Sequence, residues 1–174
     1  MPEFSLFGNT APTSIHDDGQ GGLNLGFHVV PSVDVKLLAF REYGWPIKRA
    51  FFFPHWDAVG VLWDAAGNSI LSVPFNSLVG TDPTGLPDAW RNHWIHPRYP
   101  LLAGVEYVVS VWLYRERYGV TFGTFAAPYT VGPLTVPAPG GVPSSGVYVY
   151  AGGLTFPTQQ FIAGTAYGVD IIVE

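Results

Sequence analysis

Hydrophobic and polar residues alternate at period two along much of this chain. The segment 105–114 is the clearest case, because Val109 and Val111 fall on one face while Glu106 and Ser110 fall on the other. This alternation is typical of a strand with one buried and one exposed face. The segment therefore predicts a half-buried strand in an antiparallel sheet.

A hairpin is predicted between residues 59 and 71. Two apolar runs flank Asp64–Asn68, where Gly67 can adopt the positive φ that a tight loop needs. Asp64 has the position expected of an Asx-type turn, and this role accounts for its carboxylate. Trp63 shares a strand face with Val59 and Val61, which predicts a place in the core.

The remaining strands follow from the same alternation. They are expected at 23–29, 33–42, 49–53, 58–63, 69–75, 118–122, 147–150 and 165–173. Between them, 76–100 and 126–145 are predicted to be irregular, with one helical turn at 87–92 because proline suits a first helical position. Short strands separated by frequent turns predict an all-β fold, a single antiparallel β-sandwich of jelly-roll-like form.

The chain divides into two regions by composition. Residues 1–22 are polar and glycine-rich and predict a flexible N-terminal arm, whereas residues 23–174 predict the β-sandwich domain. No internal repeat is visible in either region.

Composition excludes several classes of function. Charged residues make up 12% of the chain, and the net charge is −5, so neither nucleic acid nor an anionic membrane surface is an expected partner. The absence of cysteine excludes disulfides, thiolate metal sites and thiol catalysis. The N-terminal residues show no signal peptide pattern, and no apolar run reaches the roughly 20 residues that span a bilayer.

Ordered motifs along residues 23–174 carry a family resemblance. They lie at 25–27, 37–41, 61–64 with Gly67, 100–109, 146–150, 156–157 and 167–170. With these motifs the chain resembles a bacterial and phage β-sandwich domain of unknown function, found beside polysaccharide-active and adhesive modules in surface proteins. The resemblance implies a sandwich with an accessory role and no reaction. The Pro- and Phe-rich insert at 44–55 and the Trp- and His-rich segment before Val105 depart from the pattern.

Tryptophans in the predicted irregular segments are candidates for sugar binding. The apolar C–H face of a pyranose stacks on the face of an indole ring, and neighbouring polar groups bond the hydroxyls. The candidate glycan-binding residues are Trp45, Trp56, Trp90, His93 and Trp94. The alternative role for these tryptophans is packing or contact between subunits.

Metal and catalytic sites are weakly supported. His93 and His96 are three residues apart, near Asp88, but ordinary packed histidines explain this spacing better than a metal site. No cofactor is expected, although Asp17–Gly19 or Asp82 would suit a structural calcium ion. A glycosidase needs two carboxylates about 5–10 Å apart across a cleft, and no pair stands out, so no catalytic residue is predicted. Asp170 lies between apolar residues and predicts a buried, hydrogen-bonded carboxylate.

We expect a non-enzymatic structural or adhesive module of a bacteriophage virion: a capsid decoration, fibre or minor tail protein. The arm would dock on other virion proteins, and the sandwich would contact host-surface glycans. The expected location is the virion, and low charge with many aromatic residues also suits contact between copies. The alternative is a carbohydrate-binding accessory module of a secreted bacterial enzyme or adhesin, and a small hydrolase is a third hypothesis.

Overall fold

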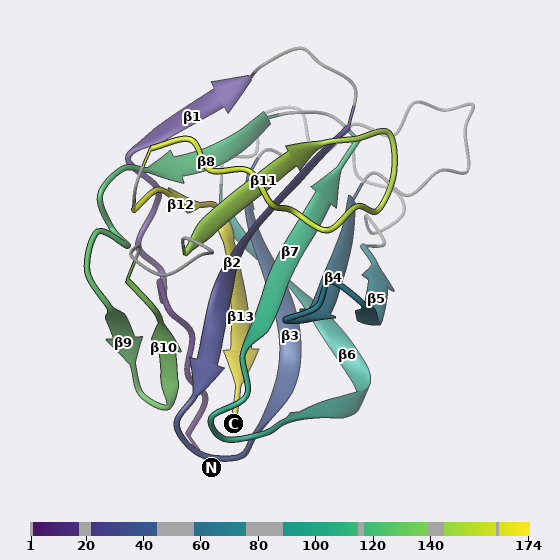
Figure 1. The fold of residues 1–174 in the computed structure, drawn as a ribbon, viewed down its shortest axis with the longest axis vertical. Coiled ribbons are helices and arrows are strands. Elements are labelled where there is room, and N and C mark those ends of the chain that lie inside the picture. The colour runs from purple at the N-terminus through teal and green to yellow at the C-terminus, as the bar shows by residue number, and fades with distance from the viewer. Residues whose placement is uncertain are drawn as a thin grey trace.

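The computed structural model describes residues 2–17, 22–44, 58–75, 89–114, 117–138, 145–162 and 164–174. These residues form strands, turns and loops, and none of them forms a helix long and apolar enough to cross a membrane (Figure 1). The strands are β1 (Ser14–Asp17), β2 (Leu23–Pro31), β3 (Val35–Gly44), β4 (Ala58–Asp64), β5 (Ser69–Pro74), β6 (Ala89–Leu101), β7 (Tyr107–Leu113), β8 (Arg117–Thr121), β9 (Tyr129–Val131), β10 (Leu134–Val136), β11 (Gly146–Tyr150), β12 (Ala166–Tyr167) and β13 (Val169–Val173). The predicted all-β class is confirmed.

The largest sheet has the strand order β5-β4-β7-β2-β10-β9, and β11 also pairs with β2. All of these pairings are antiparallel. One edge of β2 pairs with β7, while the other pairs with β11 at Leu25 and with β10 at Val30. The strand β2 therefore lies at the centre of the sheet and links its two halves.

Two smaller sheets complete the sandwich. One has the order β13-β3-β6 and the other the order β1-β8-β12. Gly168 connects them, because its carbonyl accepts the Tyr43 amide at 2.8 Å and its own amide donates to the Gly119 carbonyl at 2.7 Å. The sheet β13-β3-β6 packs against the large sheet, where β13 contacts β7 and β2. These layers confirm the predicted β-sandwich.

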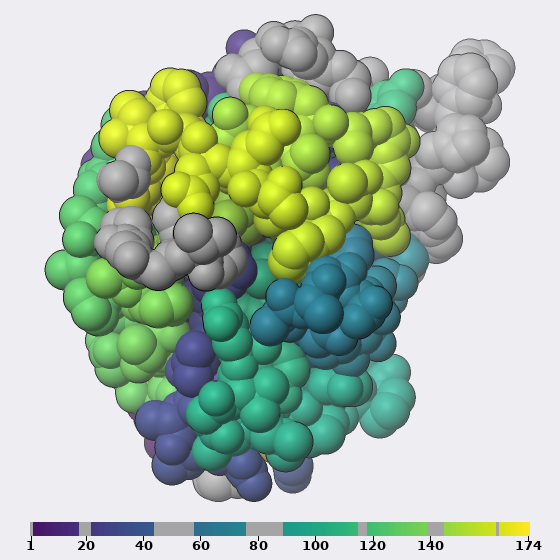
Figure 2. All heavy atoms as spheres, viewed as in Figure 1, coloured from purple at the N-terminus to yellow at the C-terminus, as the bar shows by residue number. Residues whose placement is uncertain are grey.

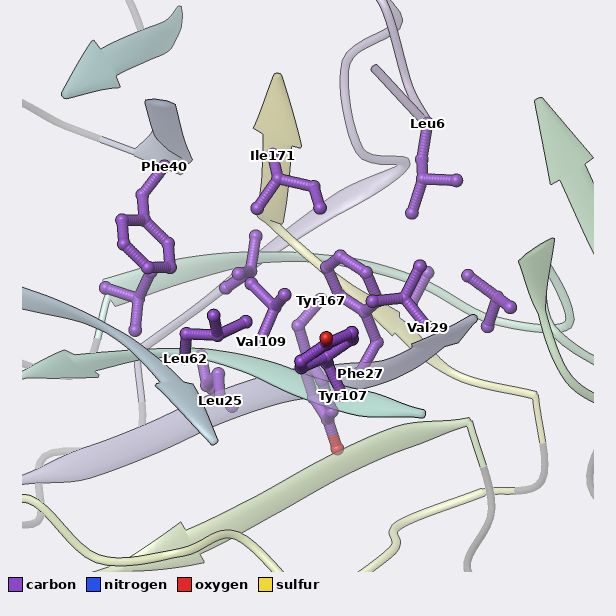
Figure 3. Packing of buried hydrophobic residues seen from close by; sticks show 14 of the residues in the cluster. Leu6, Leu25, Phe27, Val29, Phe40, Leu62, Tyr107, Val109, Tyr167 and Ile171 are labelled. Atoms are coloured by element: carbon purple, nitrogen blue, oxygen red, sulfur yellow. The ribbon is translucent and has the colours of Figure 1, made fainter. Parts of the chain in front are cut away.

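The core lies between the large sheet and β13-β3-β6. Phe27 and Val109 enter it from the large sheet, and Phe40 and Ile171 enter from the opposite side (Figure 3). All four side chains are at most 1% exposed. Burying a large apolar side chain contributes about 1.5–3 kcal/mol, so this layer is the main source of stability.

Strand β7 is buried on both faces, which corrects the prediction of a half-buried strand. Val108 and Ser110 lie on the face predicted to be exposed, yet both are 0% exposed. The indole nitrogen of Trp63 donates to Ser110 Oγ at 2.8 Å, and the Phe156 ring packs edge-to-face against Trp63. A second apolar layer therefore covers this face. The prediction that Trp63 is a core residue is confirmed.

The predicted hairpin is present between β4 and β5. Gly67 has a φ of 87°, and Asp64 Oδ1 accepts the amides of Ala66 at 2.9 Å and Asn68 at 2.8 Å. Hydrogen bonds from Asn68, first from its side chain and then from its backbone, lower the pKa of Asp64. The predicted Asx-type turn is thus confirmed.

Residues 2–17 pack on the sandwich and are not a flexible arm. Phe4 pairs with Val173 of β13, and Leu6 is 2% exposed within the core. The strand β1 pairs with β8 along its length. Apolar residues such as Phe4 and Leu6, which lie between the polar residues of this segment, make these contacts. The overall polar composition of the segment does not predict them.

Two segments predicted to be irregular form strands. Residues 89–92 begin β6, where Trp90 pairs with Tyr43 and Asn92 pairs with Arg41, so the predicted helical turn is wrong for these residues. Strands β9 and β10 form a hairpin within the predicted loop, with Gly132 at a φ of 55° in its turn. In both places the backbone hydrogen bonds are made with a neighbouring strand. The residue pattern of one segment does not show whether such a neighbour is present. The strand predicted at 49–53 lies outside the described residues.

Candidate functional site

A cavity of about 330 Å³ lies between strands β1, β8 and β12 on one side and β11 on the other. We call it the aromatic groove. Its lining consists almost entirely of aromatic and aliphatic side chains: His16, Leu25, Tyr118, Val120, Phe122, Tyr148, Tyr150, Phe161 and Tyr167. These strands lie together at the upper end of the molecule in Figure 1, and residues 145–162 cover much of the upper part of the face seen in Figure 2.

The groove follows from strand alternation and register. Tyr118, Val120 and Phe122 are spaced two residues apart, so they project from one face of β8 and its continuation. Tyr148 and Tyr150 do the same on β11. His16 is the direct partner of Tyr118 in the pairing of β1 with β8. The backbone pairings therefore place these rings side by side.

Burial divides the lining into a floor and a rim. Leu25, Val120 and Tyr167 are 1%, 2% and 6% exposed, and they form the floor. Phe122, Tyr150 and Phe161 form the rim, with exposures of 44%, 36% and 62%. Exposed aromatic side chains around a concave site are a common feature of ligand-binding surfaces.

Seven rings of the lining form one continuous series of contacts. Their order is Phe161, Phe122, His16, Tyr118, Tyr167, Tyr148 and Tyr150. Neighbouring ring centroids are 5.8–6.3 Å apart, and the angles between ring planes range from 33° to 79°. Such tilted and edge-to-face pairs stabilise each other and hold the lining in place.

The nine described residues that line the groove include no Lys, Arg, Asp or Glu. Its polar groups are the tyrosine hydroxyls and the His16 imidazole, which can donate and accept hydrogen bonds. This combination can stack against apolar faces of a ligand and bond its hydroxyl groups.

Three of the predicted glycan-binding residues, Trp90, His93 and Trp94, lie on β6 and do not line this groove. Trp45 and Trp56 lie outside the described residues. Trp90 stacks on Phe7 with centroids 5.8 Å apart, and its indole nitrogen donates to the Thr10 carbonyl at 2.8 Å. It therefore holds the N-terminal segment in place.

The other two β6 candidates have different surroundings. His93 stacks face to face on Phe75, with ring centroids 3.6 Å apart, whereas Trp94 is 52% exposed. His93 is half-buried, whereas His96 is exposed in the irregular stretch of β6 where the register with β3 shifts. In the described part of the chain no group of three or more His, Cys, Asp or Glu could hold a metal ion.

The calcium hypothesis falls mainly outside the described residues. Asp18, Asp82 and Asp88 are among the residues that the structure does not describe. Asp17 ends β1 and is exposed. A structural calcium ion therefore stays a prediction.

Asp170 fixes the N-terminal segment to β13 and β3. Its buried carboxylate accepts the amides of Leu6 at 3.0 Å and Phe7 at 3.3 Å. It also accepts a hydrogen bond from Arg41 Nη1 at 3.0 Å, and Arg41 Nη1 donates to Ser5 Oγ at 3.0 Å. The set Ser5, Leu6, Phe7, Arg41 and Asp170 is called the Asp170 clamp below. The predicted buried, hydrogen-bonded carboxylate is confirmed.

The electrostatics of the clamp are dominated by burial. Asp170 is 0% exposed, and its burial raises the pKa of the carboxyl group to about 6, against the opposing effect of backbone hydrogen bonds and of Arg41. Arg41 is 5% exposed and lies 4.8 Å from the centre of the Trp90 ring. The clamp therefore contains a buried ion pair whose guanidinium group packs against the Trp90 ring.

The N-terminal segment contributes residues to both the clamp and the groove. Residues 2–13 lead directly into β1, which supplies His16 to the groove. Pro12 packs so closely on Gly119 of β8 that a Cβ there would meet the Pro12 ring at 2.4 Å. The position of His16 thus depends on contacts made by the N-terminal segment.

Sequence reasoning missed the groove, although a signal was present. Tyr148 and Tyr150 alternate with Val147 and Val149, so aromatic residues occupy the face of β11 opposite Val147. Aromatic rings on a strand face predicted to be exposed indicate a binding surface. The spatial neighbours His16 and Phe161, however, come from distant parts of the chain.

Comparison with known proteins identifies the family. No curated protein matches the chain. Residues 9–169 match the family described as a domain of unknown function, DUF4082, and the match includes β1 and all nine described lining residues of the aromatic groove. The match begins within residues 1–22, the predicted arm. The chain therefore belongs to the DUF4082 family.

Proposed function

We propose that the protein is a non-enzymatic glycan-binding module and that the aromatic groove holds the sugar. The observation that carries this proposal is the series of seven contiguous rings around a cavity of about 330 Å³. Ligand sites are typically concave and combine apolar surface with polar groups that fix orientation. The groove is concave and combines aromatic rings with tyrosine hydroxyls and an imidazole.

The chemistry of a pyranose fits the groove. Its axial C–H groups form an apolar, slightly positive face that is attracted to the negative face of an aromatic ring. Phe122, Tyr150 and Phe161 expose ring surface at the rim for such stacking. The His16 imidazole and the tyrosine edges supply polar atoms for sugar hydroxyls.

Binding is better supported than hydrolysis. Glycosidases usually place two carboxyl groups about 5–10 Å apart on either side of the bond that is cleaved. Among the described residues that line the aromatic groove there is no carboxylate. We therefore assign recognition and no reaction to this site.

The wider role predicted from the sequence stays a prediction. A virion protein that contacts host glycans and an accessory module of a secreted enzyme or adhesin would both use such a groove. Docking through residues 1–22 is less favoured, because residues 2–17 already contact the sandwich through β13 and β8. The proposal of glycan binding rests on the aromatic groove and does not depend on which of these wider roles applies.

Glycan-array screening of the full chain tests the proposal, followed by calorimetry with the best ligand. Tyr150→Ala and Phe161→Ala are expected to weaken binding by roughly tenfold each, which corresponds to about 1.4 kcal/mol. Tyr114→Ala is the matched control, because Tyr114 is 58% exposed and does not line the groove. A ligand that binds both groove variants as tightly as it binds the unsubstituted protein would contradict the proposal, and loss of its binding in Trp94→Ala would favour β6 instead.

A further inference from the structure

We infer that the aromatic groove selects short, neutral and soluble oligosaccharides, and discriminates against anionic sugars and the flat faces of crystalline polysaccharides. This inference rests on the proposed function and narrows its ligand class. Three properties of the groove lead to it: the charge of its lining, its size and the angles between its rings.

The charge of the lining disfavours acidic sugars. A uronate or sulfate group entering the groove would lose water, and the lining residues that the structure describes include no Lys or Arg to replace it. The whole chain also has a net charge of −5, which disfavours the approach of anionic ligands. An anionic oligosaccharide should therefore bind at least about tenfold more weakly than a neutral one of the same length.

The size of the groove limits the length of the ligand. Its volume of about 330 Å³ is close to the lower limit of the roughly 300–1,000 Å³ found for small-molecule sites. One or two sugar rings fill such a space. Further units can contact only rim residues such as Phe161, so affinity should rise little beyond a short oligosaccharide.

The ring angles distinguish a soluble chain from a crystal surface. A flat polysaccharide face needs several aromatic rings in one plane, but contacting rings here are inclined by 33° to 79°. The floor residues Leu25 and Tyr167 are 1% and 6% exposed and lie below the rim. A crystalline surface can therefore touch the rim but not the floor, whereas a single sugar unit can be contacted from several sides.

Calorimetry on the full chain at neutral pH tests the inference. The neutral probes are the disaccharides and tetrasaccharides of glucose, mannose, galactose and N-acetylglucosamine, and the anionic probe is tetragalacturonate. Microcrystalline cellulose and chitin are used in pull-down assays. Tyr150→Ala reports on the groove, and Tyr114→Ala serves as the control for an exposed tyrosine elsewhere.

We expect at least one neutral series to bind in a Tyr150-dependent manner. The disaccharide and tetrasaccharide should differ by less than about threefold, and tetragalacturonate and the crystalline polymers should bind at least about tenfold more weakly. Tyr150-dependent binding of tetragalacturonate or crystalline cellulose at equal strength would overturn the selectivity while leaving glycan binding intact. Absence of Tyr150-dependent binding to every probe would overturn the proposed function itself.

Discussion

Removing Arg41 tests how strongly the Asp170 clamp stabilises the fold. Arg41 and Asp170 are 5% and 0% exposed, with Nη1 and Oδ2 3.0 Å apart, so Arg41→Met leaves a buried carboxylate without its cation. Breaking a buried ion pair by removing one partner typically costs about 3–5 kcal/mol. That loss is a large share of the roughly 5–15 kcal/mol by which a domain of this kind is stable.

The loss should depend on pH, and its sign follows from the pKa of Asp170. Burial raises this pKa to about 6 from 3.8, so the stability that the group contributes is fully present below pH 3.8 and is lost as the pH rises through 6. Removing the Arg41 charge raises the pKa further, which extends this loss to higher pH. Arg41→Met should therefore be most destabilising at pH 8 and less so at pH 5, where the carboxyl group is protonated.

Urea unfolding at pH 5 and pH 8 measures both effects, and amide exchange at Leu6 and Phe7 reports whether the N-terminal segment is released. Arg98→Met is the control, because Arg98 is 50% exposed in its ion pair with Glu174 and such pairs contribute about 0–1 kcal/mol. A loss for Arg41→Met within about 1 kcal/mol of the control at pH 8, or equal at both pH values, would refute this account of the clamp.

Three further predictions concern the scaffold. Gly67→Ala should destabilise the protein by about 1–2 kcal/mol in urea unfolding, because Gly67 has a φ of 87° and a Cβ would lie 3.0 Å from the Phe156 ring; an unchanged midpoint would contradict this. Phe27→Ala should cost about 3–5 kcal/mol in the same assay, since Phe27 is 1% exposed in the core. Burial lowers the pKa of His28 from 6.5 despite its bond to Glu106, so its contribution is present above pH 6.5 and is lost as the pH falls through the folded-state value. Comparing the pH dependence of unfolding in His28→Gln checks this, and identical slopes would count against it.

Much of the fold could be predicted from local patterns. Residues adjacent in sequence determine the alternation in β2, β3 and β7 and the turn at Asp64–Asn68. The order of residues is therefore enough to predict these elements. Burial of both faces of β7 could not be read in this way. It depends on Phe156 and Trp63, which reach Ser110 and Val108 from other parts of the chain.

The candidate site was harder to predict because register creates it. Composition favoured the tryptophans as binding residues. Trp90, however, contacts Phe7 and Thr10 and so holds the N-terminal segment against the sandwich. The groove instead combines His16, Tyr118 and Tyr150 from strands that are far apart in sequence. The polar composition of residues 1–22 also concealed the few apolar side chains, such as Leu6, that bind this segment to the core.

The most direct test of the central claim is a crystal structure of the full chain with a neutral disaccharide that binds it. The account predicts a sugar ring inside the aromatic groove, with its C–H face against Tyr150, Phe122 or Phe161 and its hydroxyls near His16 or the tyrosine edges. Sugar bound over β6 at Trp94, with the groove unoccupied, would contradict the claim.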